Sequence, residues 1–307
     1  MTVSSTFKHK DAASYDDVAG IFDGLTHRYA KAQAQALVQA IDVGARRHVI
    51  DLGCGTGLVA FHAAAASGQD TQVTGINLSA GMLAQASFQA RQADLSNRVR
   101  FQTGDAEALD LPDGCVDGIV SLYAFSHFPH PQKAAEEAIR VLSPGGRLAV
   151  AIGSGPRLMT LKGLKRAAVV VRRKLNQARG REVTANELID KLVRQHLPPV
   201  KEGHVATWAS GQRDITALLD GLFGKAGFVD RTRDWVGTDY SVPSIDEFWT
   251  LQSTLSTFAR KHIAAASVQQ SAMLKDAFWA ECEGVLARKG KLAYSVGAAI
   301  VSARKPG

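Results

Sequence analysis

The spacing of apolar residues changes twice along the chain. In residues 14–43 apolar side chains recur at intervals of three and four, which predicts a helical entry segment. These side chains are Tyr15, Val18, Phe22, Leu25 and Tyr29. From residue 45 to residue 155, short apolar runs alternate with helical stretches. Past residue 155 this alternation stops.

The middle region is typical of a sheet wound by helices on both faces. Apolar runs of strand type occupy residues 48–53, 71–76, 98–104, 116–123 and 147–153. Stretches with a helical pattern occupy residues 58–66, 82–93 and 132–142. Strands that alternate with helices of this length indicate a parallel sheet. We therefore expect a doubly wound α/β fold.

The C-terminal half has helical patterns at residues 158–197, 211–226 and 244–288, and strand-like runs at 226–236 and 292–303. The two late runs bring the expected, mostly parallel sheet to seven strands. We predict four parts: N-terminal cap helices in 1–44, a Rossmann-like core in 45–155, a basic helical insertion in 156–210, and the last core elements in 211–307 with a further helical insertion at 244–288.

A glycine-rich loop follows the first expected strand. The sequence DLGCGTG at 51–57 leaves a strand and opens a helix. Glycines at 53, 55 and 57 allow the backbone to turn tightly and to lie against a ligand where a Cβ would collide. A loop in this position predicts a nucleotide-type site at the carboxyl end of the strand. The G-x-G-x-G spacing differs from the G-x-G-x-x-G of dinucleotide enzymes, and no P-loop Lys follows, so a pyrophosphate cradle is disfavoured.

Four further stretches follow the glycine loop in order: GINLSAGML at 75–83, GDAEALDLPDGCVD at 104–117, SLYAFSHFPHPQ at 121–132 and RVLSPGGRLAV at 140–150. With them the chain resembles the class I S-adenosylmethionine-dependent methyltransferases, in the small-molecule branch that includes ubiquinone biosynthesis. The resemblance covers residues 45–153, and more weakly the late strands. It implies a methyltransferase of Rossmann-like fold, with S-adenosyl-L-methionine as cofactor and S-adenosyl-L-homocysteine as product.

The resemblance also implies roles for single residues. Asp51 would accept hydrogen bonds near the ammonium end of the methionine moiety. Asn77 stands where the family most often has an acidic residue that binds the ribose hydroxyls; a neutral acceptor contributes about 0.5–1.5 kcal/mol against roughly 1.5–3 kcal/mol for a charged one. Asp105 would accept from the adenine amino group. The implied cofactor set is Asp51, Gly53, Cys54, Gly55, Gly57, Asn77, Leu78, Met82, Asp105, Ala106 and Ser121.

Each polar member of this set has a structural alternative. Asp51 is also suited to capping the glycine turn, Asn77 to forming a turn, and Asp105 to capping a short helix. The correct order of five motifs favours the cofactor interpretation.

Two histidines follow the fourth expected strand, on the edge where the transferable methyl group should point. Methyl transfer from a sulfonium is an in-line displacement, so a base is needed only for some acceptors. A neutral imidazole is the usual general base near pH 7, and we predict this role for His127; the alternative is a structural His-Phe pair. An H-x-x-H metal site with His130 is disfavoured, because the intervening Phe-Pro favours a turn and no third ligand is evident. We expect no metal.

Aromatic residues are candidates for the acceptor pocket. They are Tyr15 and Tyr29 in the entry segment, and Phe248 and Trp249 in the insertion at 244–288, which the resemblance makes a lid. Such a lining suits a small hydrophobic or aromatic metabolite, of quinone-like or secondary metabolism, methylated at O, N or C. Core packing explains the same residues equally well.

The net charge of +7 is local. Residues 157–181 hold nine basic residues and no acidic one; taking these from the 36 Lys and Arg leaves 27 against 29 Asp and Glu. Within them Leu164, Ala168, Val171 and Leu175 form an apolar stripe. We predict a cationic amphipathic helix outside the nucleotide fold, used as a lid, a homodimer contact or a peripheral membrane contact. Nucleic acid is disfavoured, because no recognised binding module accompanies the charge.

Composition limits the remaining classes. A chain of 307 residues with 46% hydrophobic residues suits one large core with an appended region. Cys54, Cys115 and Cys282 lack the spacing of a disulfide framework or zinc site. Without a secretory or bilayer-spanning pattern, we expect a cytoplasmic protein. Two alternatives stay open: a nicotinamide-dependent oxidoreductase, and a catalytically silent scaffold that binds the cofactor or a partner protein.

Overall fold

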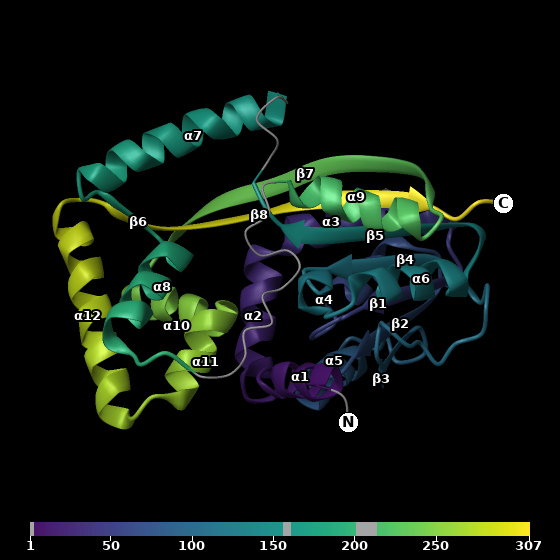
Figure 1. Cartoon of the computed structure of the whole chain (residues 1–307), viewed down its shortest axis with the longest axis horizontal. Helices are drawn as coiled ribbons and strands as arrows, with labels where there is room; N and C mark the ends of the chain where they lie inside the picture. The colour runs from purple at the N-terminus through teal and green to yellow at the C-terminus, as the bar shows by residue number, and fades with distance from the viewer. Residues whose placement is uncertain (1–2, 156–160, 201–213) are drawn as a thin grey trace. The chain divides into compact units, whose positions relative to one another are not determined.

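The computed structural model describes residues 3–155, 161–200 and 214–307 (Figure 1). They form two compact units. Unit 1 comprises Met1–Gly155, His204–Val236 and Gly297–Gly307, and unit 2 comprises Pro156–Gly203 and Gly237–Val296. The chain therefore passes between the units four times. Two of these passes lie within strands, because β7 (Val229–Val242) and β8 (Lys291–Arg304) each begin in one unit and end in the other.

Unit 1 is built on a mostly parallel sheet. Its strand order is β3 (Val99–Thr103), β2 (Gln72–Asn77), β1 (His48–Leu52), β4 (Val116–Leu122), β5 (Leu142–Gly153) and β8, with β7 also pairing with β8. The first five strands run parallel, and β8 runs antiparallel to β5. The seven expected strands are all present. An eighth strand, β6 (Glu182–Thr184), was not predicted.

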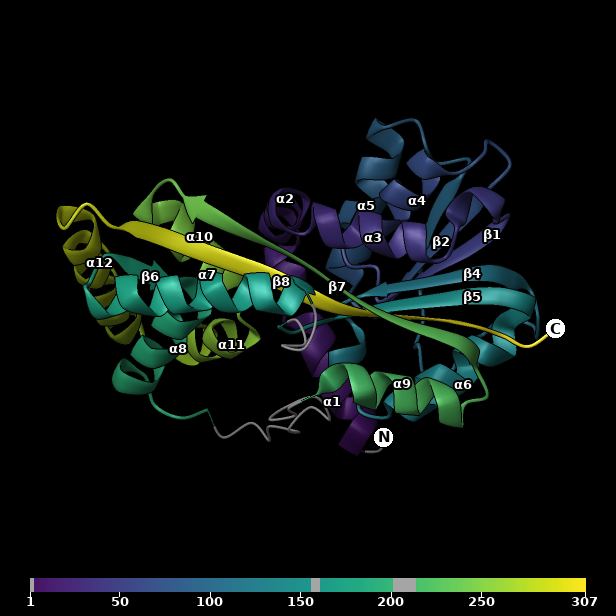
Figure 2. The same ribbon diagram turned by 90° about the horizontal axis from the view of Figure 1, so that it is seen from above.

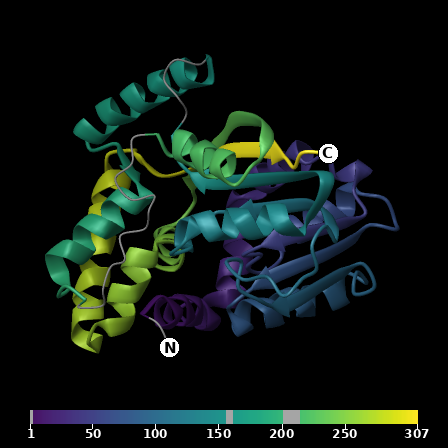
Figure 3. The same ribbon diagram turned by 45° about the vertical axis from the view of Figure 1, so that its right-hand side comes forward.

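Helices cover both faces of this sheet (Figures 2 and 3). One face packs against α3 (Lys31–Ala40) and α4 (Leu58–Ala66), and the other against α6 (Pro131–Val141) and α9 (Ile215–Lys225). The alternation along β5 shows the two faces directly: Leu148 and Val150 belong to the core under α6, whereas Ala149 and Ala151 belong to the core under α3. The predicted doubly wound fold is confirmed.

Capping residues, a proline and glycines mark where several elements of unit 1 begin or turn. Ser79 caps α5 (Ala80–Gln92) by accepting from the Met82 N–H at 3.1 Å, and Pro131 occupies the first turn of α6. The left-handed residues Gly57 and Gly145 allow the turns that precede α4 and interrupt the early part of β5.

The strand order reverses between β1 and β4. The chain adds β2 and β3 on one side of β1, and β4 and β5 on the other. The loops after β1 and β4 therefore diverge at the carboxyl edge of the sheet and leave a crevice, the usual ligand position in open parallel sheets.

In the described part of the chain, five helical segments lie N-terminal to the sheet: α1 (Val3–Ala13), the 3-10 turn η1 (Asp16–Val18), α2 (Ala19–Tyr29), α3 and the 3-10 turn η2 (Val43–Ala45). The prediction of continuous helix over 14–43 is wrong at Ala30, which leaves helical geometry (φ −114°, ψ 7°) and caps the helices on both sides. Apolar spacing continues through a single-residue break, so the pattern gave no sign of it.

Unit 2 contains α7 (Leu161–Ala178), β6, α8 (Ala185–His196), α10 (Ile245–Leu255), α11 (Thr257–Ala265) and α12 (Val268–Ala287). Its buried core includes Ile189, Leu251, Leu274 and Phe278. The prediction of continuous helix over 158–197 is wrong, because Gly180 adopts φ +64° after α7 and β6 then pairs with the start of β8. The helical pattern over 244–288 is also broken, at Ser256 and again at Ala266 and Ser267, which gives three helices. Residues 156–160 and 201–210 of the expected insertion, and residues 211–213 of the helix expected over 211–226, lie outside the described residues.

Candidate active site

The glycine loop after β1 adopts the backbone geometry that its composition predicts. Gly53, Gly55 and Gly57 have φ of +69°, +54° and +91°, a region that side chains disfavour. The N–H groups of Gly53 and Cys54 both donate to the Ile76 carbonyl, at 2.8 and 3.1 Å. These bonds fix the loop to the end of β2, so that the ends of the two strands act as one rigid edge.

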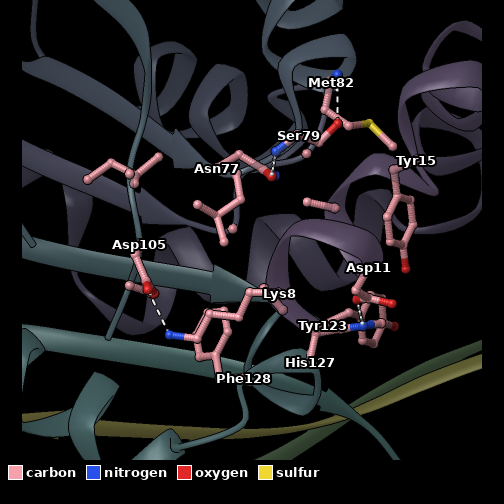
Figure 4. Close-up of a pocket in the computed structure, with 18 of the residues that line it drawn as sticks. Lys8, Asp11, Tyr15, Asn77, Ser79, Met82, Asp105, Tyr123, His127 and Phe128 are labelled. Carbon is pink, nitrogen blue, oxygen red and sulfur yellow. Dashed lines mark hydrogen bonds and ion pairs between the residues drawn. The ribbon is translucent and has the colours of Figure 1, made fainter. Parts of the chain in front are cut away.

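A cavity of about 170 Å³ opens at this edge, between the strand ends and the N-terminal helices (Figure 4). Nine of the predicted site residues line it: Tyr15, Gly53, Gly55, Asn77, Leu78, Met82, Asp105, Ala106 and His127. These nine residues are thus brought to a single place by segments that are far apart in sequence.

Asp51 and Ser121 lie behind the cavity rather than on its wall. The Asp51 carboxylate is 1% exposed, and its Oδ2 accepts from the Ala60 N–H at 3.1 Å. Its Oδ1 has no hydrogen-bond partner among the described residues. Burial raises the pKa of Asp51 to about 7, although the Ala60 N–H opposes this. Ser121 is fully buried and donates to the Leu52 carbonyl at 2.7 Å, which ties β4 to β1.

Cys54 and Gly57 also do not line the cavity. Burial and the nearby Asp51 raise the pKa of the Cys54 thiol well above its ordinary value, so it is not a nucleophile. A Cβ on Gly57 would lie 2.8 Å from both Phe61 and Phe101. Gly57 therefore allows two aromatic rings to pack behind the loop.

Three of the predicted pocket residues lie elsewhere. Tyr29 is 1% exposed in the core of unit 1. Phe248 and Trp249 belong to unit 2, where both rings pack against Phe278. Tyr29 and Phe248 are buried core residues, whereas Trp249 is half-buried.

Asn77 ends β2 with its side chain at the cavity. Its Oδ1 accepts from the Ser79 N–H at 2.9 Å, which is an Asx turn. Ser79 in turn donates through Oγ to Asp16 Oδ1 at 2.5 Å, and the same oxygen accepts from the Gly81 N–H at 2.9 Å. The turn and cavity interpretations of Asn77 therefore hold together, because the turn aims the amide at the cavity.

Asp105 meets a cation that the sequence did not suggest. Lys8 of α1 donates to Asp105 Oδ2 at 2.7 Å (Figure 4). Its Nζ also lies 2.6 Å from Glu107 Oε2. Burial lowers the pKa of Lys8, but the bonds to the two carboxylates outweigh it and the net shift is upward. The Oδ1 atom of Asp105 accepts from the Glu107 N–H at 2.9 Å. Asp105 thus caps the turn after β3 and also faces the cavity.

His127 is paired with a carboxylate from α1, the helix that also carries Lys8. Its Nδ1 lies 3.0 Å from Asp11 Oδ2, and Asp11 is buried. The Tyr15 ring packs edge-on to the imidazole, with the ring centroids 6.1 Å apart. Next to it Tyr123 lines the cavity at φ +62°, a conformation that costs about 1–3 kcal/mol and is concentrated at functional sites.

Several cavity residues were not predicted from sequence: Lys8, Asp11, Ala12, Ile76, Ser79, Gly104, Leu122, Tyr123, Ala124, Phe128 and Pro129. For α1 a signal existed. Lys8 and Asp11 are three residues apart, so they lie on one face of α1, and Tyr15 follows two residues after the helix ends. This face is polar, and a search for apolar periodicity passes over it.

Comparison with known proteins agrees with this geometry. Residues 49–146 match the model of a family described as a methyltransferase domain. A ubiquinone/menaquinone biosynthesis C-methyltransferase of Methylobacterium nodulans is 36% identical over 138 residues, which are 44% of this chain and 53% of that protein. A 27-O-demethylrifamycin SV methyltransferase of Amycolatopsis mediterranei is 34% identical over 136 residues, 44% of this chain and 48% of that one.

The chain thus spans about half the length of the curated relatives it matches. Among solved structures, a [4+2]-cyclase named SpnF has a TM-score of 0.58 at 21% identity, with 97% of each chain covered. At this identity the likeness concerns the fold alone. The match over residues 49–146 identifies this part of unit 1 as a methyltransferase domain, and the glycine loop lies within the matched residues.

Proposed function

We propose that this protein transfers a methyl group from S-adenosylmethionine to a small, hydrophobic or aromatic acceptor, with His127 as the base for acceptors that must lose a proton. The observation that carries the proposal is the single cavity in which the glycine loop, Asn77 and Asp105 lie together with the His127–Asp11 pair.

The residues present fit the cofactor. Gly53 and Gly55 form a wall that a larger residue would fill or distort. Two buried polar atoms of the loop, Asp51 Oδ1 and Thr56 Oγ1, have no hydrogen-bond partner among the described residues, and an ammonium group near them would supply the missing donors. Met82 and Ala106 offer apolar surface for a purine.

The two polar cavity residues would divide the nucleoside between them. Asn77 would bind the ribose, since its amide keeps a donor and an acceptor site beyond the Ser79 bond. Asp105 would accept from the adenine amino group, because a carboxylate has about four acceptor sites and two are used here.

S-adenosylmethionine, when bound, supplies an electrophilic methyl group on a sulfonium. The task of this chain is then to hold the acceptor atom in line and to remove its proton where necessary. Asp11 favours the tautomer of His127 that donates from Nδ1, which makes Nε2 the proton acceptor. The buried Asp11 carboxylate would also stabilise the imidazolium that forms.

The cavity wall near His127 supports an apolar acceptor. Tyr15, Phe128 and Pro129 contribute rings, and Leu122 contributes an aliphatic side chain. The two curated relatives are named for a C-methyltransferase and for a methyltransferase of 27-O-demethylrifamycin. Both names concern small molecules, which supports a small-molecule acceptor, and they differ in the acceptor, so the choice of atom is left to experiment.

The test has two stages. Calorimetry with S-adenosylhomocysteine should give one site per chain; no heat and no thermal shift would reject the proposal. Transfer of a labelled methyl group is then assayed against hydroquinones, phenols, aliphatic alcohols and amines. Binding without transfer to any of these would favour the catalytically silent scaffold.

Variants then identify the base. For a hydroxyl acceptor, His127→Gln should lower kcat by roughly a hundredfold, the lower end for a general base. Asp11→Asn should lower kcat less and move the acid limb of the pH–rate profile to lower pH, because the imidazolium loses its anionic neighbour. His130→Gln is the matched control, since the His130 side chain is not among the residues that line the cavity. An unchanged kcat in His127→Gln would remove the base from the mechanism.

A further inference from the structure

The exposed face of α7 is apolar. Leu164, Val171 and Leu175 are 64%, 59% and 53% exposed. They recur at intervals of seven and four, so with Ala168 they form one stripe along the helix. Exposed leucine and valine side chains gathered on one face mark a surface that contacts something apolar.

The opposite face of α7 is held by ion pairs within unit 2. Arg173 contacts Glu182 Oε1 of β6 at 2.9 Å and Asp239 Oδ1 of β7 at 2.8 Å, and Arg166 pairs with the other oxygen of Asp239. The side chains of Arg166 and Arg173 are only 17% and 14% exposed. Because these bonds anchor one face, the apolar stripe is kept on the other.

Cations flank the stripe on both sides. At 3.6 residues per turn, Lys165 and Arg172 lie about a quarter turn to one side of Leu164, and Lys174 lies about a quarter turn to the other. All three are exposed. Arg173 is not part of this solvated set, because it is paired inside unit 2.

We propose that α7 docks unit 2 on an anionic lipid surface, with the stripe at the headgroup boundary and the flanking cations on lipid phosphates. An apolar stripe between two rows of cations is the pattern of a helix that lies in a membrane interface. In the described part of the chain, no helix is long and apolar enough to cross a bilayer. The proposal concerns attachment and does not depend on the reaction.

Other occupants fit the surface less well. A second copy of α7 packed stripe to stripe would place the cationic flanks of both helices against each other, which is destabilising. An acidic protein would satisfy the cations, but the exposed leucines require an apolar counterpart as well. A lipid surface offers both.

The experiment uses the full chain and sedimentation with vesicles of equal parts phosphatidylcholine and phosphatidylglycerol, with phosphatidylcholine alone for comparison. Wild type should bind the anionic vesicles and bind the neutral ones more weakly. The triple variant Lys165→Gln, Arg172→Gln, Lys174→Gln should lose roughly fivefold in affinity per cation. The triple variant Leu164→Ser, Val171→Ser, Leu175→Ser should lose at least tenfold.

The matched control is Val268→Ser with Met273→Ser, which removes exposed apolar side chains of α12 (90% and 53% exposed) and should bind as wild type. Val171→Trp reports insertion directly, and its emission should shift to the blue on anionic vesicles. Equal loss in the control, no binding to anionic vesicles, or no shift from Trp at 171 would overturn the proposal. A dimer seen by light scattering and abolished by the serine variant would also overturn the proposal, because a second copy would then cover the stripe. Equal binding of wild type and the serine variant to polyglutamate would overturn it in favour of an acidic protein.

Discussion

Burial opposes the ionisation of Asp51, whereas a bound cation would favour it. Burial raises its pKa to about 7, so near neutral pH the side chain is only partly ionised. Oδ1 has no partner in the described part of the chain. A cation beside this oxygen would favour the ionised form and would itself be bound more tightly by it.

The affinity for S-adenosylhomocysteine should therefore rise with pH. Between about pH 6 and about pH 8 the ionised fraction of Asp51 rises from roughly one tenth to roughly nine tenths, so Kd measured by calorimetry should fall by up to about tenfold. Asp51→Asn should flatten this dependence.

The ionisation of Asp51 should also affect the stability of the ligand-free protein. Because burial raises the pKa of Asp51 from 3.8 to about 7, its contribution to the free energy of unfolding is full below about pH 4 and is lost as pH rises from there through about 7. The free energy of unfolding of Asp51→Asn should accordingly fall less over this range than that of wild type. Equal pH dependence of both Kd and stability in the two proteins would show that Asp51 does not titrate there.

Two variants of Asn77 distinguish its role in the turn from a contact with the ligand. Asn77→Ala removes both, and should weaken binding of S-adenosylhomocysteine by roughly tenfold, about one hydrogen bond. Asn77→Asp keeps an acceptor for the Ser79 N–H and adds the charge that favours ribose hydroxyls, so its Kd should fall a few-fold below wild type. If alanine weakens binding and aspartate changes nothing, Asn77 acts through the turn alone.

Site residues could be predicted from the sequence when they lie at or near the end of a strand. Asn77 is the last residue of β2, Asp105 lies two residues after β3, and both line the cavity. Lys8 and Asp11 come from a helix about 100 residues away from their partners. Their role follows from how α1 packs, and the local sequence holds no apolar face that would reveal that packing.

The glycine loop shows how one element combines two requirements. Gly53 must be small because its Cβ would lie 2.2 Å from the Ala124 Cβ, and Gly57 because of the rings behind it. The sequence analysis attributed all three glycines to ligand approach. For Gly57 the structure gives a different reason, namely the packing of Phe61 and Phe101.

Gly57→Ala should therefore act on stability. The φ of +91° and the contacts at 2.8 Å predict a loss of about 1–3 kcal/mol in the free energy of unfolding, measured by urea titration. Gly68→Ala is the matched control, since a Cβ there meets nothing within 4 Å and should change stability by less than about 0.5 kcal/mol. A Gly57→Ala protein as stable as the control would mean that the rings move aside without cost.

At the scale of whole helices, the type of element was easier to predict than its ends. Residues 58–66 form a helix with the predicted bounds, because a left-handed glycine begins it. The breaks at Ala30 and Gly180 were missed. At both positions the helical pattern continues on each side, and only the tertiary packing requires the chain to change direction.

At the scale of the whole molecule, the alternation of strands and helices was sufficient to predict the sheet of unit 1. It was not sufficient to show that unit 2 is made of two separate stretches of chain. The pairing of β6 with β8 joins residues more than 100 positions apart, and a three-residue strand has too little pattern of its own to be recognised. Because β7 and β8 continue through both units, tests of either unit are best made on the full chain.

Hydrogen exchange with and without S-adenosylhomocysteine tests the whole arrangement at once. All residues that line the cavity belong to unit 1, so we expect slower exchange in the segments around 53–57, 77–82, 104–106 and 122–129. The helices α8, α10 and α12 should be unchanged, because Phe248 and Phe278 already fill a buried core within unit 2.

This measurement also decides the proposed role of the insertion at 244–288. A lid that closes over bound cofactor or acceptor would gain protection in α10, where Phe248 and Trp249 lie. Protection there comparable with that of the glycine loop would assign the two aromatic residues to the site. Protection confined to unit 1, also when an acceptor identified by the transfer assay is present, would leave Phe248 as a buried core residue and Trp249 as a half-buried residue packed against Phe278.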